Sequence, residues 1–428
     1  MKPKVYIEQD DLFYNKVKWV VFLISQYTSV TYDFVEQKEN PDIRIGTLSN
    51  NDIQINILFF DKLQNGITKW QDILPIGPIY IDEKGKECLL ESIFYLVNCI
   101  QELNVEESDF DQWGRFKFTS SLQYHYGLIE TNFVSQLMDK IIQMFPILLG
   151  GKSKPKRPSK IFLSHDIDMI HSGWKIEGYL ALTSFNFSLL SKVFKGIISK
   201  KPFYNNIQQV IDKDKSYGFK SCFYWLPSLG KDNNGIMNAD YSLSDMKQMI
   251  LEVESQGFAC GIHKSSFNTE LEEESLRFDH PIEHNRYHFL KFQTHEAWKK
   301  IEQAGLKTDS SLGFAEHIGF RNSYGLPFVP FDMENDKPFS FVEIPLHVMD
   351  ITLYKYMDIS PDEMQNTINQ FFAKNSHNSL ISILWHNNMM TDYTYISLNK
   401  LYNYLLQSFR EKNYNTLLPD EIYGEYIG

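Results

Sequence analysis

The segment Lys160–Asp168, with the sequence KIFLSHDID, decides the fold that we predict for this chain. Its apolar run Ile161–Leu163 is typical of a buried strand, and the segment ends with two carboxylates, Asp166 and Asp168. Because side chains alternate between the two faces of a strand, both carboxylates project from the same face. Burying them is costly unless a cation or hydrogen bonds compensate. We therefore expect either a strand that runs into an acidic loop, or a site where one carboxylate binds a metal and the other acts as a base.

Strand-like and helical segments alternate after this strand. Further strands are expected at Ser221–Leu226, Phe258–Ile262, Val342–Val348 and Leu380–Trp385, and helices at Ser244–Gln256, Thr294–Ala304 and Pro361–Ala373. This alternation is typical of parallel strands joined by crossover helices, in a barrel or in an open sheet. Since the carboxyl ends of the strands carry the chemistry in barrels, we expect the functional side chains there.

A polar segment divides the chain. Residues 151–159 are rich in Lys, Ser and Pro, and they predict a linker between an N-terminal domain, residues 1–150, and a C-terminal domain, residues 160–428. The first domain is interpreted as mixed α/β of unknown function, with strands at Ile53–Phe60 and Ile79–Ile81 and helices at Cys88–Gln101 and Phe133–Phe145. Of twelve histidines, only His125 precedes the linker, so chemistry that needs imidazole is expected in the second domain.

Composition restricts the classes of function. The formal charge of −12 argues against a nucleic-acid partner, because binding phosphates needs a basic surface. The four cysteines form no CxxC pair, so a bound metal would be held by nitrogen and oxygen. No apolar run reaches membrane-spanning length, and the first residues lack the apolar stretch of a signal peptide. We expect a cytoplasmic protein.

Polar residues end several predicted strands in turn. They are the segments His165–Asp168, Gly261–Ser266, Arg286–His288, Gly319–Arg321, Pro345–Asp350 and Ile383–Asn387. In this order the segments resemble the motifs of the polysaccharide deacetylase (NodB-homology) family, and in particular a bacterial branch with an HD(I/V)D first motif. Residues Trp113–Phe116, with Ser120, Ser121, Tyr126 and Gly127, are similar to the uncharacterised domain of that branch. The resemblance implies a deformed (β/α)7 barrel preceded by a smaller mixed α/β domain.

The resemblance also implies a metal site with one divalent ion, most simply zinc. Asp166 corresponds to the general base, and Asp168 and His263 correspond to metal ligands. The second motif of the family is usually H-x-x-x-H, but Phe267 stands four residues after His263 and cannot bind a cation. We predict that His288 replaces the missing ligand. The alternatives that remain open are a water molecule, Ser266, His165 and His295.

Three further residues have roles implied by the resemblance. Arg321 corresponds to the arginine that orients the base, His386 to the histidine that protonates the leaving group, and Asp350 to the carboxylate partner of that histidine. A zinc-like cation would polarise an amide carbonyl and lower the pKa of bound water. The predicted activity is metal-dependent removal of an acyl group, N-acetyl in the simplest case, from a sugar. The alternatives are an inactive glycan-binding protein on the same scaffold, and a deacylase for another amide such as N-formyl.

The segment Tyr179–Lys201 is aromatic and aliphatic at first and then basic. A helix lying on a membrane surface has this composition, and it would suit a lipid-linked glycan. The interpretation that we prefer is an inserted helical pair, packed on the barrel or in a dimer interface, and an oligomer is possible. As partners we expect a carbohydrate, either free or lipid- or nucleotide-linked.

Overall fold

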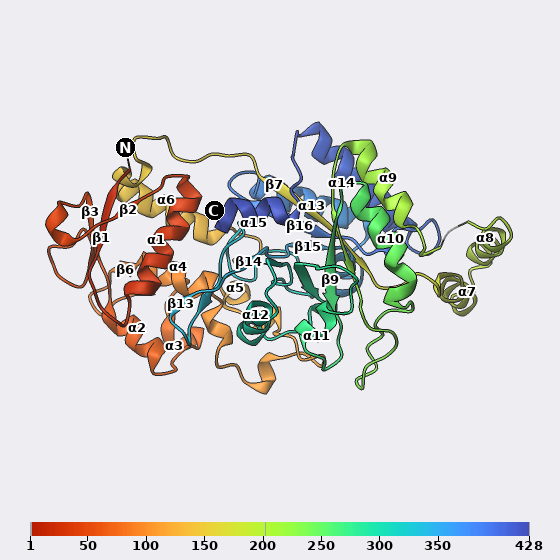
Figure 1. Ribbon diagram of the computed structural model, residues 1–428, viewed down its shortest axis with the longest axis horizontal. Coiled ribbons are helices and arrows are strands. Elements are labelled where there is room, and N and C mark those ends of the chain that lie inside the picture. The colour runs from red at the N-terminus through yellow and green to blue at the C-terminus, as the bar shows by residue number, and fades with distance from the viewer. Residues whose placement is uncertain (1, 202, 428) are drawn as a thin grey trace.

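The computed structural model describes residues 2–201 and 203–427 of the chain. Its largest element is an eight-stranded sheet in which all neighbouring strands are parallel (Figure 1). In order across the sheet, the strands are β14 (Val342–Glu343), β11 (Thr308–Asp309), β10 (His284–Tyr287), β9 (Ala259–Lys264), β8 (Cys222–Trp225), β7 (Lys160–Ile167), β16 (Leu380–Leu384) and β15 (Val348–Met349). The predicted α/β class is therefore confirmed.

A short stretch of chain joins the two edges of this sheet. β14 lies at one edge and β15 at the other, although only residues 344–347 separate them. A chain of that length spans at most about 18 Å. Ile344 N donates a hydrogen bond to Asp309 O at one edge (2.8 Å), and His347 N donates to Ser382 O at the other (3.3 Å). The sheet is therefore curled, and residues 344–347 bridge its open side.

β7 lies near the centre of the curled sheet, between β16 and β8. Every residue from Ile161 to Ile167 is buried, as expected for a parallel strand that is covered on both faces. Ser164 stands opposite Cys222 of β8 on one side and Leu384 of β16 on the other. This register places the acidic end of β7 among the ends of its neighbours.

Helices connect the strands and cover the sheet. They are α7 (Gly173–Thr183), α8 (Phe187–Ile198), α9 (Ile207–Tyr217), α10 (Leu243–Ser255), α11 (Leu271–Ser275), α12 (Thr294–Gln303), α13 (Pro361–Lys374), α14 (Ile396–Glu411) and α15 (Pro419–Ile427). Figure 1 shows α7 and α8 at one end of the long axis and the N-terminal strands at the other. No helix among the described residues is long and apolar enough to cross a bilayer.

The N-terminal part has a parallel sheet of its own, with the order β2 (Asp33–Phe34), β1 (Lys4–Ile7), β3 (Ile43–Gly46) and β4 (Ile53–Gln54). Its helices are α1 (Tyr14–Thr28), α2 (Ile57–Gln64), α3 (Trp70–Ile73), α4 (Leu89–Val97), α5 (Leu122–His125) and α6 (Phe133–Met144), and a hairpin pairs β5 (Tyr80–Ile81) with β6 (Glu87–Cys88). The hydrophobic core continues into the second half of the chain. Trp19 of α1 meets Phe331 edge-on, and its Nε1 donates to Val329 O (2.8 Å).

The predicted strands and helices of the larger sheet are present, with three differences in the chain as a whole. The helix predicted at Cys88–Gln101 ends at Val97, because Cys99 has a left-handed φ of 50° and a separate 3-10 helix follows at Ile100–Glu102. The strand predicted at Ile53–Phe60 ends at Gln54, because the Asn56 side chain accepts a hydrogen bond from Phe59 N (3.3 Å) and caps the start of α2. The single strand predicted at Val342–Val348 is two short strands on opposite edges of the sheet. Its middle residues form the bridge between those edges.

Candidate metal centre

The candidate site lies where β7, β9 and β10 end. Asp166 belongs to β7 and Asp168 follows it, His263 belongs to β9, and His288 comes directly after β10. Parallel strands end at the same rim of a curled sheet, so these side chains converge. Of the seven residues predicted for the site, four form this group, His386 contacts it and Asp350 contacts His386, whereas Arg321 lies elsewhere.

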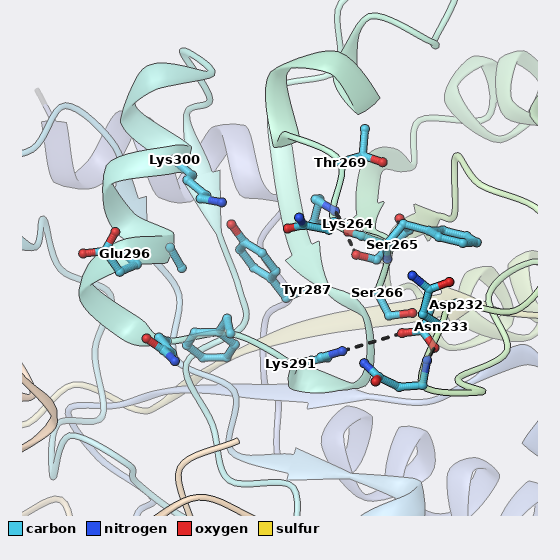
Figure 2. Close-up of a pocket in the computed structure, with 16 residues that line it drawn as sticks. Asp232, Asn233, Lys264, Ser265, Ser266, Thr269, Tyr287, Lys291, Glu296 and Lys300 are labelled. Carbon is cyan, nitrogen blue, oxygen red and sulfur yellow. Dashed lines mark hydrogen bonds and ion pairs between the residues drawn. The ribbon is translucent and has the colours of Figure 1, made fainter. Parts of the chain in front are cut away.

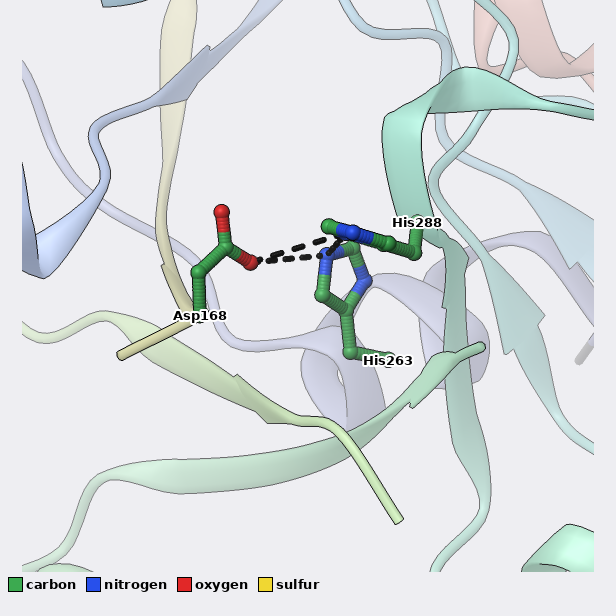
Figure 3. A group of neighbouring side chains, drawn as sticks. All are labelled: Asp168, His263 and His288. Carbon is green, nitrogen blue, oxygen red and sulfur yellow. Dashed lines mark hydrogen bonds and ion pairs between the residues drawn. The ribbon is translucent and has the colours of Figure 1, made fainter. Parts of the chain in front are cut away.

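Three side chains form the candidate metal-binding group, and Figure 3 shows them pointing toward one another. Asp168 Oδ1 lies 3.5 Å from His263 Nε2 and 3.6 Å from His288 Nδ1, and the two nitrogens are 3.1 Å apart. Ligands held about 2.0–2.2 Å from one tetrahedral ion are separated by about 3.3–3.6 Å. Asp168, His263 and His288 can therefore hold one metal ion.

The hydrogen bonds behind the two imidazoles fix their tautomers. His263 Nδ1 faces Arg286 O (3.0 Å), and His288 Nε2 faces Met237 O (2.9 Å). A carbonyl oxygen only accepts hydrogen bonds, so both outer nitrogens carry the proton. The inner nitrogens then present lone pairs to each other at 3.1 Å. Two such acceptors repel each other unless a cation or a proton lies between them, and metal-binding histidines are oriented in the same way.

The charge state of the group also suits a cation. Asp168 Oδ1 is buried and accepts no hydrogen bond, although buried polar atoms are normally satisfied. Burial acts to raise the pKa of Asp168, but the neighbouring His288, His263 and His386 outweigh it and hold that pKa well below its usual range. Burial lowers the pKa of His288, which favours the neutral ring that metals bind. The group therefore combines an ionised carboxylate with a neutral imidazole.

Asp166 is held by a buried arginine. Its Oδ1 accepts from Arg286 Nη1 (3.0 Å), and its Oδ2 lies 3.3 Å from His263 Nε2. Arg286 also donates from Nη1 to Ser164 Oγ (2.8 Å) and from Nε to Ser310 O (3.0 Å), and its guanidinium lies over the Tyr224 ring at 4.5 Å. Arg286 is therefore fixed by hydrogen bonds to β7 and to the residue after β11, and by the Tyr224 ring of β8. The carboxylate of Asp166 is thereby kept beside the candidate metal ligands.

The structure corrects the placement predicted for Arg321. Its Nε and Nη2 donate to the Glu102 carboxylate at 3.0 and 2.6 Å, and its Nη1 donates to Gly313 O at 3.1 Å. Arg321 and Glu102 are both buried, so this pair joins the N-terminal part to the rim region. The arginine that contacts Asp166 is Arg286. The motif around Arg321 contains the expected residue type, but its guanidinium has another partner.

A histidine and a carboxylate form the other side of the site. His386 Nδ1 lies 2.7 Å from Asp350 Oδ1, and His386 N donates to Asp350 Oδ2 at 2.7 Å. Burial acts to lower the pKa of His386, but Asp350 outweighs it, with help from Asp168 and Asp166, and raises that pKa to about 10. His386 Nε2 lies 3.8 Å from Asp168 Oδ2. The side chains of His386 and Asp168 are 12% and 17% exposed, so the site opens to solvent at these two residues.

The other residues considered for the third ligand lie elsewhere. Ser266 Oγ hydrogen-bonds to the Asn238 side chain. His165 is fully buried, with Nε2 3.2 Å from Asp214. His295 Nε2 faces a backbone carbonyl of the N-terminal part. None of these three side chains belongs to the Asp-His-His group, and His288 completes it.

The turn that carries His288 is clamped from the N-terminal part. Phe289 and Leu290, which follow His288, have φ values of 63° and 50°, a left-handed conformation that is unusual for bulky residues. Arg115 Nη1 donates to Phe289 O (3.2 Å), and the Arg115 guanidinium lies 5.1 Å from the Phe289 ring. Trp113 packs edge-on against the same ring at 5.3 Å. The segment around Trp113 and Arg115 thus stabilises the turn that presents a candidate ligand.

A polar cavity of about 440 Å³ lies beside the site, on the other face of β9 and β10 (Figure 2). Lys264 and Tyr287 line it, and they stand opposite each other in the register that also pairs His263 with Arg286. Successive residues of a strand face opposite ways, so the histidine and arginine point into the barrel while Lys264 and Tyr287 point outward. Phe267 also lines this cavity. The cavity is therefore separate from the candidate metal ligands.

One protein-family model is similar to the first third of the chain. Residues 5–147 match a family of unknown function, DUF7033. The match falls within the segment that the sequence predicts as the N-terminal domain. Among curated proteins, none matches this chain.

Two solved structures are similar to parts of this one at low identity. One is a polysaccharide deacetylase from Bacillus cereus, with 11% identity, a TM-score of 0.30, and coverage of 60% of this chain and 90% of that chain. The other is a 4-alpha-glucanotransferase from Thermococcus litoralis, with 10% identity, a TM-score of 0.35, and coverage of 63% of this chain and 41% of that chain. At these TM-scores the similarity does not indicate a function. The function is therefore inferred from the side chains of the site.

Three residues around the site were not predicted as part of it. Arg286 stands two residues before His288, and strand alternation puts both on the same face, so the sequence contained a signal for it. Glu102 and Arg115 act from the N-terminal part. No spacing in the sequence indicates that these two side chains reach the second half of the chain.

Proposed function

We propose that this chain is a metal-dependent hydrolase that removes an acyl group, N-acetyl in the simplest case, from a sugar. The observation that carries the proposal is the pair of inward-facing imidazole nitrogens beside the orphaned Asp168 oxygen, because one divalent cation would satisfy all three atoms at once. The carbohydrate class is supported by the ordered motifs that resemble those of polysaccharide deacetylases. The chemistry of the site residues supports hydrolysis of an acyl bond with the help of a metal.

Asp168, His263 and His288 would hold the ion. Two imidazoles and one carboxylate with a remaining open position are a donor set that suits catalytic zinc. When bound, such an ion supplies Lewis acidity toward an amide carbonyl and lowers the pKa of a neighbouring water. The outer hydrogen bonds of His263 and His288 keep both rings in the tautomer that binding requires.

Asp166 would act as the general base. Its Oδ1 is engaged by Arg286, so Oδ2, near His263, is the oxygen available to accept a proton from attacking water. The hydrogen bond from Arg286 fixes the orientation of the Asp166 carboxylate. In this proposal Arg286 is a positioning residue, and it takes the role that the sequence assigned to Arg321.

His386 would act as the general acid. Asp350 accepts from Nδ1, so a protonated ring presents its second proton on Nε2, which faces the open rim near Asp168. An amine leaves an acyl carbon only when it is protonated, and a donor at this position meets that need. The pair also resembles the carboxylate–histidine arrangement that orients catalytic imidazoles.

The proposal is tested by metal content and by acetate release from N-acetylated sugars. We expect His288→Ala to lose the metal and His284→Ala, at a buried histidine that begins β10, to retain it. Asp166→Asn should retain the metal and lose turnover by at least about a hundred-fold. A wild-type protein that binds no divalent metal, or a His288→Ala variant that binds it normally, would contradict the proposal.

Product analysis separates the remaining alternatives. Release of formate with no release of acetate identifies a deacylase for N-formyl groups. Calorimetry that detects glycan affinity in metal-free protein, with no acyl product, identifies an inactive glycan-binding protein. The main support for inactivity in the sequence was Phe267, and His288 now stands within reach of the other two ligands.

A further inference from the structure

Helices α7 and α8 form a hairpin that projects from the end of the molecule (Figure 1). Large apolar side chains cover its outer surface. Those at least 60% exposed are Tyr179 at 66%, Leu182 at 60%, Phe185 at 80%, Phe187 at 76%, Phe194 at 64% and Ile198 at 67%. Single exposed apolar residues are ordinary, but a contiguous group of this kind marks an interaction surface.

The hairpin has two distinct apolar faces. Leu189, Val193 and Gly196 of α8 are buried, and Leu189 and Val193 pack with Tyr393 of the barrel. A second stripe at helical spacing, formed by Phe187, Leu190, Phe194 and Ile197, lines a groove of about 750 Å³ with Trp174, Gly178 and Leu182 of α7. The first face explains how the hairpin is attached. The second face is left uncovered by the rest of the described chain.

The tip of the hairpin is built to present aromatic rings. Phe185 has a φ of 53°, an unusual conformation for a bulky residue, and its ring is 80% exposed. The next residue, Asn186, accepts a hydrogen bond from Leu189 N (3.0 Å) and caps α8. Phe187 follows at once. The cap therefore holds two exposed rings at the turn between α7 and α8.

The charge of the hairpin is opposite to that of the whole chain. The chain carries a formal charge of −12, but residues 173–201 contain five exposed lysines: Lys175, Lys192, Lys195, Lys200 and Lys201. Their only acidic residue, Glu177, is buried and accepts from Thr394. Within the described residues, no carboxylate lies at ion-pair distance from these lysines. The hairpin is thus a basic, aromatic projection on an acidic protein.

We propose that the α7–α8 hairpin docks on the surface of a lipid bilayer that contains anionic lipids. Aromatic and aliphatic side chains enter the interface, and lysines beside them meet the headgroups, as in other interfacial helices. A second copy of this chain is a poorer occupant, because a symmetric interface would bring the same lysines together. The charge pattern therefore favours an anionic surface.

The hairpin is also connected directly to the candidate metal centre. α7 begins at Gly173, and the chain between Asp168 and this helix is held by Asp240, which accepts from Ile170 N (2.7 Å) and Ser172 N (2.6 Å). A docked hairpin would thus hold the rim near Asp168 at a fixed position relative to the bilayer. This geometry would suit a sugar substrate that is itself attached to lipid.

The test is co-sedimentation of the full-length protein with vesicles of phosphatidylcholine alone or mixed with phosphatidylglycerol. We expect binding to the mixed vesicles, and a loss of more than about a hundred-fold in the triple variant Phe185→Ser, Phe187→Ser, Phe194→Ser. Two other exposed apolar residues, Ile76 (81%) and Leu276 (77%), provide the matched control. Their replacement by Ser should leave binding unchanged.

A second pair of variants separates local charge from net charge. Lys192→Glu with Lys195→Glu should weaken binding to the mixed vesicles by at least about thirty-fold. Lys84→Glu with Lys374→Glu changes the net charge equally at exposed positions elsewhere, and it should have little effect. Absence of wild-type binding, or equal losses in hairpin and control variants, overturns the proposal.

Sedimentation velocity tests whether a second copy of the chain, instead of a bilayer, covers this face of the hairpin. A wild-type dimer that the triple variant dissociates, without any binding to vesicles, would identify the face as a self-association interface and overturn the proposal. Circular dichroism and metal content of the triple variant should match those of the wild type. Vesicle binding does not depend on catalysis, so its outcome is independent of whether the proposed deacylase activity is found.

Discussion

Two buried arginines, one at the rim of the curled sheet and one at the junction with the N-terminal part, make similar contacts in different surroundings. Arg286 pairs with Asp166, and Arg321 pairs with Glu102. Beside Asp166 lie two imidazoles with inward lone pairs and an orphaned carboxylate oxygen. The Glu102 carboxylate, in contrast, accepts its hydrogen bonds within the described chain from Arg321 and the hydroxyl of Thr294. A buried arginine–carboxylate pair therefore does not by itself mark a functional site. The groups around each carboxylate are what distinguish the two arginines.

Replacing each arginine by Met would sharpen this comparison most. Each change leaves a buried carboxylate without its partner, so we expect the free energy of unfolding to fall by about 3–5 kcal/mol in both variants. Only Arg286→Met should also lower kcat, by at least about a hundred-fold, because only Asp166 faces the proposed reaction. Urea denaturation and acetate release measure the two effects.

A double variant is the control for the junction. Glu102→Leu added to Arg321→Met removes both charges, so much of the lost stability should return. Equal losses of kcat per folded molecule in Arg286→Met and Arg321→Met would break the comparison.

Two histidines show the same contrast between rim and interior. His386 at the rim has a raised pKa, whereas burial lowers the pKa of His347 to about 3. His347 Nδ1 accepts from Ser382 N (3.0 Å), which requires the neutral ring. As the pH falls below the ordinary histidine value, the unfolded chain takes up a proton that folded His347 does not. Stability is therefore lost progressively between the unfolded pKa and about pH 3.

We expect His347 to contribute about 2 kcal/mol to the loss of unfolding free energy between about pH 7.5 and about pH 5. His347→Gln keeps an acceptor for Ser382 N and removes the titration, so its stability should depend less on pH by that amount. Chemical denaturation at the two pH values measures the difference. Identical pH dependence in the two proteins would show that folded His347 is protonated.

The clamp on the turn after β10 predicts a smaller effect. Arg115→Ala removes the hydrogen bond to Phe289 O and the contact with its ring. We expect metal affinity, measured by competition with a chelator, to fall by about ten-fold, since residues behind a ligand have effects of this size. Turnover at saturating metal should be unchanged. Arg44→Ala, elsewhere in the N-terminal part, is the control, and an equal effect there would refute the clamp.

The smallest effect is expected far from the site. Asn56→Ala removes the cap of α2 and should lower the free energy of unfolding by about 1 kcal/mol. Metal affinity should not change, because no described contact links this cap to the rim. A change in metal affinity would show that the N-terminal sheet acts on the site by more than the Arg115 clamp.

The sequence predicted the parts of the fold that have strong local patterns. β7, β8, β9 and β16 are apolar runs, and they were found close to their observed residues. β10 has the sequence HNRY and β11 has only two residues, so neither has a hydrophobic signal. The predicted strand at Val342–Val348 was misread because its apolar residues alternate with Glu343, Pro345 and His347, as in one continuous strand, while its two ends pair with opposite edges of the sheet.

The sequence likewise predicted the positions of the candidate site residues where a local pattern places them, and it missed those that depend on a long-range contact. Asp166, Asp168, His263 and His386 stand at strand ends, where topology alone brings side chains together, and His288 was inferred from the number of ligands needed. Arg321 was assigned from a motif, and a motif names a residue type without fixing its partner. Its partner Glu102 lies 219 residues earlier in the chain. Contacts of that kind depend on how the two halves pack, which no local pattern contains.

The bridge formed by residues 344–347 has an evolutionary consequence. Because it bonds to both edges of the curled sheet, its length sets how far apart those edges stand, and so the circumference of the rim. An added residue would have to bulge outward or loosen one edge. We expect homologous chains to keep this segment at constant length while its composition drifts, and to differ in length at the freely projecting turn between α7 and α8.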